Sequence, residues 1–212
     1  MKKLILTLLL LSSFHFASGQ FKVRVIDKDE GYPSTVYVLV DNYEVSAYGI
    51  QVENFQLGHY DDPVFIEMTR EECARMRSAL KKIRRQYRKW DLSAKVHNVR
   101  NYAKMFDTTL PPVSLLWTTT EESAWGGKTD VKHRADSVVL SPCFYVKDGN
   151  TSAACRYAPD GIGSDKFSIR IFLTPYNLNN LIRNCDTKRI DRLYREKHPK
   201  PKSKEYYDSI FR

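Results

Sequence analysis

The chain has 212 residues, of which 42% are hydrophobic, 12% aromatic and 28% charged, with a formal net charge of +9 at pH 7. This length and balance exclude an intrinsically disordered chain and indicate one folded domain with a substantial apolar core. After the N-terminal leader, no apolar stretch is long enough to cross a bilayer, so we expect no transmembrane segment.

The N-terminus has the three parts of a secretory signal peptide. A basic start at Lys2 is followed by an apolar run over residues 4–11 and by small residues at Ala17 and Gly19, the positions that a signal peptidase reads. We expect cleavage near Gly19, a mature chain that begins at Gln20, and a soluble bacterial protein that works in the periplasm or is secreted.

The segments that follow the leader resemble strands. Residues 21–25 alternate between apolar and polar side chains, and residues 35–40 are apolar and mostly β-branched. Residues 43–52 and 63–68 continue this pattern on either side of a turn-rich stretch.

A long helix begins where this strand pattern stops. Thr69 and Glu72 match a capping box, the reciprocal pair of hydrogen bonds that starts many helices. Apolar residues then recur every three or four positions, at Cys73, Met76, Leu80, Ile83, Tyr87 and Trp90. This stripe predicts a single amphipathic helix over about residues 69–98.

Strands return in the second half of the chain. They are predicted over residues 113–120, 137–147, 151–157 and 167–173, and residues 177–185 have a helical pattern. This order predicts an α+β fold, in which a largely antiparallel sheet packs against the long helix and short C-terminal helices. The expected organisation is a signal peptide over 1–19, a single α+β domain over 20–197, and a basic, proline-containing tail over 198–212.

The predicted long helix carries an unusual accumulation of positive charge. Between Arg75 and Lys89 there are eight bases and no acid. The helical spacing turns most of them away from the apolar stripe, which makes a set of candidate anion-binding residues: Arg75, Lys81, Lys82, Arg84, Arg85, Arg88 and Lys89. Either acids elsewhere in the fold neutralise these bases, or the helix meets an anionic partner.

Four cysteines in an exported chain predict two disulfides. A three-residue loop over 148–150 would place Cys143 directly opposite Cys155 in an antiparallel hairpin, whereas a two-residue turn would put the two sulfur atoms on opposite faces. The pairing Cys143–Cys155 leaves Cys73 to pair with Cys185.

The sequence contains no complete motif of a known enzyme, cofactor site or metal site, so no residue is assigned to catalysis, cofactor binding or metal binding. We expect an exported binding protein rather than an enzyme, with no cofactor. Its expected partner is an anionic envelope component, either a polysaccharide or a lipid head group, or another protein, and not nucleic acid. Two alternatives stay open. One is a small secreted hydrolase whose site is assembled from sequence-distant Asp, Glu and His residues. The other is a structural or inhibitory protein that caps a partner through the acidic side of the sheet.

Overall fold

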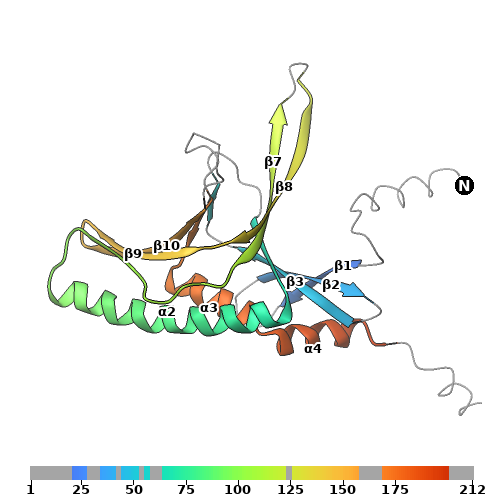
Figure 1. Cartoon of the computed structure of the whole chain (residues 1–212), viewed down its shortest axis with the longest axis horizontal. Helices are drawn as coiled ribbons and strands as arrows, with labels where there is room; N and C mark the ends of the chain where they lie inside the picture. Colours follow the sequence, from blue (N-terminus) through green and yellow to red (C-terminus); the bar gives the residue numbers. More distant parts are fainter. Residues whose placement is uncertain are drawn as a thin grey trace, which may run out of the picture.

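The computed structural model describes residues 21–27, 34–41, 44–52, 55–57, 64–122, 126–157 and 169–200. These residues form two antiparallel sheets, with helices lying along one side of both (Figure 1). The predicted α+β fold is confirmed, although two sheets replace the single sheet that was expected. The predicted signal peptide and most of the predicted tail lie outside the described residues.

The first sheet has six strands, and every neighbouring pair in it is antiparallel. In spatial order it contains β1 (Phe21–Asp27), β2 (Ser34–Asp41), β3 (Glu44–Val52), β5 (Val64–Met68), β7 (Val113–Glu122) and β8 (Lys128–Val138). The hairpin of β7 and β8 projects away from the helices (Figure 1). The sequence did not predict β8 as a separate strand, because its first half is exposed on both faces and lacks apolar alternation.

The second sheet has five strands in the order β4 (Phe55–Leu57), β11 (Ile169–Phe172), β10 (Asn150–Tyr157), β9 (Ser141–Lys147) and β6 (Tyr102–Met105). The strand predicted over 137–147 is in fact divided between the two sheets. Val138 ends β8 in the first sheet and Ser141 begins β9 in the second. Residues 139–140 therefore carry the chain from one sheet to the other.

The helices are α2 (Arg70–Val96), α3 (Pro175–Asn184) and α4 (Thr187–Lys197). The predicted capping box is confirmed at the start of α2. The Thr69 hydroxyl accepts a hydrogen bond from the Glu72 amide at 3.3 Å, and the Glu72 carboxylate accepts one from the Thr69 amide at 2.8 Å. The predicted boundaries of the long helix are within two residues of those observed.

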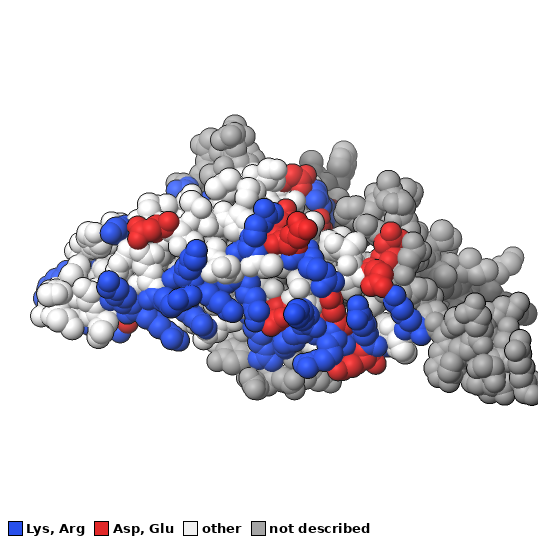
Figure 2. Space-filling model, turned by 60° about the horizontal axis from the view of Figure 1, so that its bottom comes forward, with Lys and Arg blue, Asp and Glu red and all other residues white. Residues whose placement is uncertain are grey.

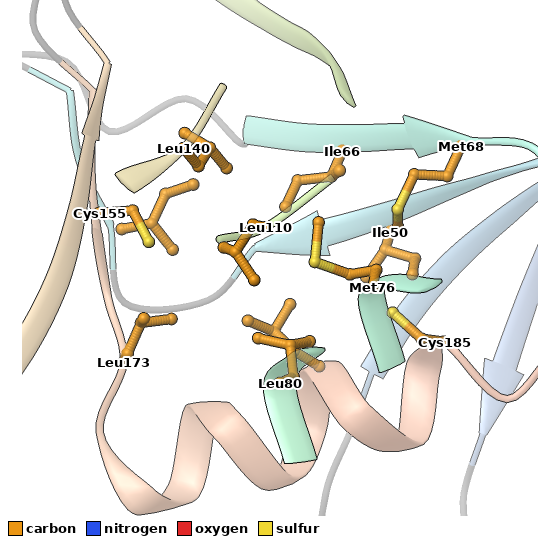
Figure 3. A pocket seen from close by; sticks show the side chains of 12 residues that line it. Ile50, Ile66, Met68, Met76, Leu80, Leu110, Leu140, Cys155, Leu173 and Cys185 are labelled. Carbon is orange, nitrogen blue, oxygen red and sulfur yellow. The ribbon is translucent and has the colours of Figure 1, made fainter. Parts of the chain in front are cut away.

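The apolar stripe of α2 packs against both sheets. In its N-terminal half, Met76 and Leu80 point toward Ile50 and Ile66 of the first sheet around a small cavity of ≈ 10 Å³ (Figure 3). Cys155 of the second sheet also lines this cavity. The space is about that of one water molecule, and because its lining is apolar, a water there would have no hydrogen-bond partners.

Aromatic rings continue this core along the C-terminal half of α2. The ring of Trp90 stacks on Phe106, with 5.0 Å between centroids, and meets the edge of Phe144 in β9 at 5.5 Å. Tyr87 contacts the same Phe144 ring at 5.6 Å. The helix therefore joins the two sheets through one continuous core.

Ionic contacts hold the N-terminal end of α2 in place. The Tyr48 hydroxyl in β3 donates a hydrogen bond to Asp191 Oδ1 of α4 at 2.7 Å. Arg70 Nη1 forms an ion pair with Asp191 Oδ2 at 2.7 Å, and its guanidinium lies 5.7 Å from the centre of the Tyr48 ring. Burial, and then the hydrogen bond to Asp191, raise the pKa of Tyr48. The three side chains connect a strand and two helices.

A second polar contact holds the other end of α2. Asp91 accepts hydrogen bonds from Lys95 on the next helical turn and from the Thr151 hydroxyl in β10. Burial raises the pKa of the Asp91 carboxyl, but the bonds from Lys95 and Thr151 outweigh this effect and lower it. The carboxylate therefore stays charged and ties α2 to the second sheet.

The predicted disulfide between Cys143 and Cys155 is wrong, because the hairpin has a two-residue turn. Lys147 pairs with Asn150, so Cys143 lies opposite Ala154 and Cys155 opposite Pro142. Asp148 and Gly149 both have positive φ, 52° and 81°, as a type I′ turn requires, and Asp-Gly is a preferred pair for it. The side chain of Cys155 is buried in the core, while that of Cys143 points to the other face of the sheet.

All four cysteines are free thiols in the structure. Cys73 and Cys185 are nevertheless neighbours, 0% and 2% exposed. A hydrogen bond with the Cys73 thiol, and then burial, raise the pKa of Cys185. Burial also raises the pKa of Cys155 to about 12, with a smaller effect from nearby Cys143. At neutral pH these two thiols stay protonated and are poor nucleophiles.

Two leucines on α2 provide a test of the core. Replacing Leu80, which is 1% exposed, with alanine should lower the free energy of unfolding by about 2–5 kcal/mol, because the lost methyl groups enlarge the central cavity. Replacing Leu92, which is 64% exposed, should change it by less than about 0.5 kcal/mol. Urea denaturation measures both, and equal losses would contradict the observed packing of α2.

The contact between Tyr48 and Asp191 predicts a specific loss in Tyr48→Phe. The variant should unfold more easily by about 1–3 kcal/mol, because one buried carboxylate oxygen loses its donor. Because folding raises the pKa of Tyr48, its hydroxyl contributes fully to the free energy of unfolding below about pH 10, the value in the unfolded chain. This contribution is lost at higher pH, so the difference in stability between the variant and the parent should shrink there. The exposed Tyr102 supplies the control Tyr102→Phe, and an equal effect of both changes would exclude a role for this contact.

Candidate functional site

Six of the seven predicted anion-binding residues lie on the side of α2 that faces away from the sheets. Five are exposed and Lys81 is half-buried. In Figure 2, Lys and Arg atoms run along this side of the molecule, and Asp and Glu atoms gather toward the side on which α4 lies. We call these six residues the basic band: Arg75, Lys81, Lys82, Arg85, Arg88 and Lys89.

Arg84, the seventh predicted residue, is used inside the fold instead. Its Nη1 donates a hydrogen bond to Asn179 Oδ1 of α3 at 2.7 Å. Arg77, also on this helix, forms an ion pair with Asp186 at 2.6 Å and donates to the carbonyl oxygen of Ile182. Both arginines lie on the flank of α2 that packs against α3. Of the eight bases between Arg75 and Lys89, Arg77 is the one that forms an ion pair with a described carboxylate.

Among the described residues, no carboxylate forms an ion pair with the basic band. The ion pairs between described residues involve bases outside the band: Arg70, Arg77, Lys95, Arg134, Arg192, Arg195 and Lys200. Within the band, Arg85 donates only to the backbone carbonyl of Lys81, at 3.4 Å. No ion pair within the described part of the chain therefore neutralises these six bases.

A groove beside α2 brings the band together with a base from another element. It has a volume of ≈ 460 Å³ and is lined by Lys82, Arg85 and Lys89 of α2 and by Lys104 of β6. The Lys104 ammonium lies 5.0 Å from the centre of the Trp90 ring, a cation–π contact. Four cations thus surround one open depression, which suits an anionic group rather than a metal ion.

The sequence did not point to Lys104 or to the acid beside it. Among the described residues, Asp107 is the one carboxylate that lines this groove, and it accepts a hydrogen bond from Gln86 Nε2 at 2.5 Å. Lys104 lies in β6 and Asp107 lies just after it. All four residues of β6 are exposed, so the sequence has no apolar pattern there that would predict this strand.

The structure also bears on the hydrolase alternative. Within the described ranges, no three or more His, Cys, Asp or Glu side chains come close enough to hold a metal ion. One pair resembles a nucleophile and its base: Thr119 Oγ1 lies 2.7 Å from His133 Nε2. Thr119 is 1% exposed, and the Trp117 ring stacks on the His133 ring with centroids 5.2 Å apart, so this pair is part of the packing. The hydrolase alternative stays a prediction without a site.

In the part of the chain that the structure describes, no helix is both long and apolar enough to span a bilayer. Comparison with known proteins finds no family model, no curated protein and no solved structure that matches this chain. Its chemistry must therefore follow from its own residues, and the basic band is the feature that calls for a functional explanation.

Proposed function

We propose that this chain is a binding protein that holds an anionic component of the cell envelope on the basic band. One observation carries the proposal. Six bases lie within four turns on one side of α2, and no carboxylate of the described residues pairs with any of them.

The arrangement of these charges supports a partner. Lys81, Arg85 and Lys89 follow one another at four-residue intervals, where like charges destabilise a helix by about 0.2–0.5 kcal/mol per pair and a Glu would instead stabilise it. An anion bound along this face removes the repulsion. The positive field around the band also attracts polyanions from a distance.

Reversing three charges around the groove tests this proposal. The variant Lys82→Glu, Arg85→Glu, Lys89→Glu should elute from a heparin column at a lower salt concentration than the parent. At roughly 1 kcal/mol per base near an anionic surface, the loss of three bases should lower its affinity by about a hundredfold. The immobilised heparin stands in for a polyanion of the envelope.

A charge-matched control separates the site from net charge. The variant Lys147→Glu, Arg170→Glu, Lys188→Glu changes the net charge by the same amount at three exposed positions outside α2. Its elution should move much less than that of the band variant. Equal shifts in the two variants would refute the basic band as the binding site, provided that both keep the urea midpoint of the parent.

We also propose that the protein works outside the cytoplasm, in the periplasm or in a secreted form. The support is the leader pattern of residues 1–19, with its basic start, apolar run and small residues at Ala17 and Gly19. In that compartment the folded protein has access to the polysaccharides and to the outer lipid surfaces of the envelope.

Export would also allow Cys73 and Cys185 to form a disulfide, and we propose that they do. Their buried thiols lie side by side, one in the first turn of α2 and the other at the C-terminal cap of α3. Disulfides persist in oxidising compartments, and closing a loop of about 100 residues stabilises a fold by up to roughly 5 kcal/mol.

Mass spectrometry of the exported protein tests both proposals together. We expect a chain that begins at Gln20 and weighs two hydrogen atoms less than the fully reduced form. Peptide mapping without reductant should link Cys73 to Cys185, while Cys143 and Cys155 react with an alkylating agent after denaturation. Finding Met1 on the exported chain would refute cleavage, and four alkylated cysteines would refute the disulfide.

A further inference from the structure

Two apolar side chains are left in water where the basic band ends. Leu92 is 64% exposed and Val96 is 66% exposed, the highest values for large hydrophobic residues in the described part of the chain. The inner face of α2 is fully apolar and well packed, so these two residues are not needed for the core. Exposed apolar side chains that cluster on one face mark sites of interaction.

Their position continues the basic band along the helix. Leu92 follows Lys89 by three residues and Arg88 by four, and Val96 follows Leu92 by four. Residues at these spacings lie on the same helix face. The same outer face of α2 therefore carries bases as far as Lys89 and exposed apolar residues after it.

An exposed tyrosine extends this end of the surface. Tyr102 of β6 is 53% exposed and lines, with Ser93 and Val99, a groove of ≈ 280 Å³ next to the end of α2. A tyrosine ring has an apolar body and a polar hydroxyl, which suits the boundary between water and lipid.

We propose that the partner of the basic band is an anionic lipid surface, on which the outer face of α2 lies with Leu92 and Val96 entering the head-group region. This inference rests on the proposed binding function and names its partner. The bases would contact lipid phosphates, and the two apolar side chains would leave water at the same time, as in helices that lie in a membrane interface.

A soluble polysaccharide explains this surface less well. It would bind the six bases, but it would leave the side chains of Leu92 and Val96 in water. A bilayer satisfies both parts of the face, because its phosphates lie directly above its hydrocarbon region.

A second copy of the chain also explains the surface less well. A symmetric dimer through this face would place one basic band against the other. The repulsion between twelve unpaired bases opposes such contact, and two leucine–valine pairs supply far less apolar area than the 1,200–2,000 Å² that stable interfaces typically bury.

Vesicle sedimentation tests the proposal with one apolar variant. The parent should bind vesicles of phosphatidylcholine mixed with phosphatidylglycerol and should not bind vesicles of phosphatidylcholine alone. The variant Leu92→Ser, Val96→Ser should bind the mixed vesicles at least about tenfold more weakly, since two side chains no longer gain from leaving water. Its elution from heparin should be unchanged, because no base is altered.

The matched control removes exposed apolar side chains elsewhere. Met105 and Val139 are 50% and 58% exposed and lie outside this face, so Met105→Ser, Val139→Ser should bind the mixed vesicles as the parent does. All proteins compared begin at Gln20, the proposed mature N-terminus, so residues 1–19 contribute to none of the measurements.

The outcomes separate the two proposals. The lipid inference is overturned, and the binding function stands, if the parent elutes late from heparin because of its basic band but does not prefer anionic vesicles. The same holds if the Leu92→Ser, Val96→Ser variant binds the mixed vesicles as strongly as the parent. Both proposals fail if reversal of the band charges changes neither heparin elution nor vesicle binding.

Discussion

The burial of one helix face under two sheets is the constraint on which the rest of the structure depends. The 27 residues of α2 extend about 40 Å, enough to cross both sheets. Its first turns pack on β3 and β5, and its last turns pack on the aromatic rings around Phe144 in β9. The chain passes between the two sheets several times, from β3 to β4, from β4 to β5, from β6 to β7 and from β8 to β9. The helix α2 and the core beneath it join the two sheets into one body.

This role leaves the opposite face of α2 free for another purpose. The inner stripe cannot accept charge without losing the shared core, and the flank toward α3 uses Arg77 and Arg84 for contacts within the fold. The remaining bases extend into solvent from a backbone that Asp191 holds at one end and Asp91 at the other. A binding surface on such a rigid element is organised before its partner arrives, so less conformational entropy is lost on binding.

Charge and apolar exposure on this face are best understood together. Each base alone is an ordinary solvated side chain, and each exposed apolar residue alone is common on protein surfaces. Their alignment along one helix face, with no acid of the described residues paired to the bases, distinguishes this side of the molecule from the ion-paired surface around Glu67, Arg134 and Asp136. The planar anionic surface that we propose as the partner matches the whole face in shape and in chemistry.

The sequence by itself determined the features that depend on neighbours along the chain. The capping box at Thr69, the apolar stripe of α2 and the apolar, β-branched segments of β2, β3 and β5 are local features of the sequence, and so is the accumulation of bases on one helix. The Asp-Gly turn was also readable locally, and reading it as a three-residue loop led to the wrong pairing of Cys143 with Cys155. Only the tertiary structure decided that there are two sheets, that exposed β6 and β8 exist, and that Lys104 joins the groove. It also decided that Arg84 faces α3 while Arg85 faces solvent. These outcomes depend on contacts between segments far apart in sequence, and for strands exposed on both faces no local apolar pattern records such contacts.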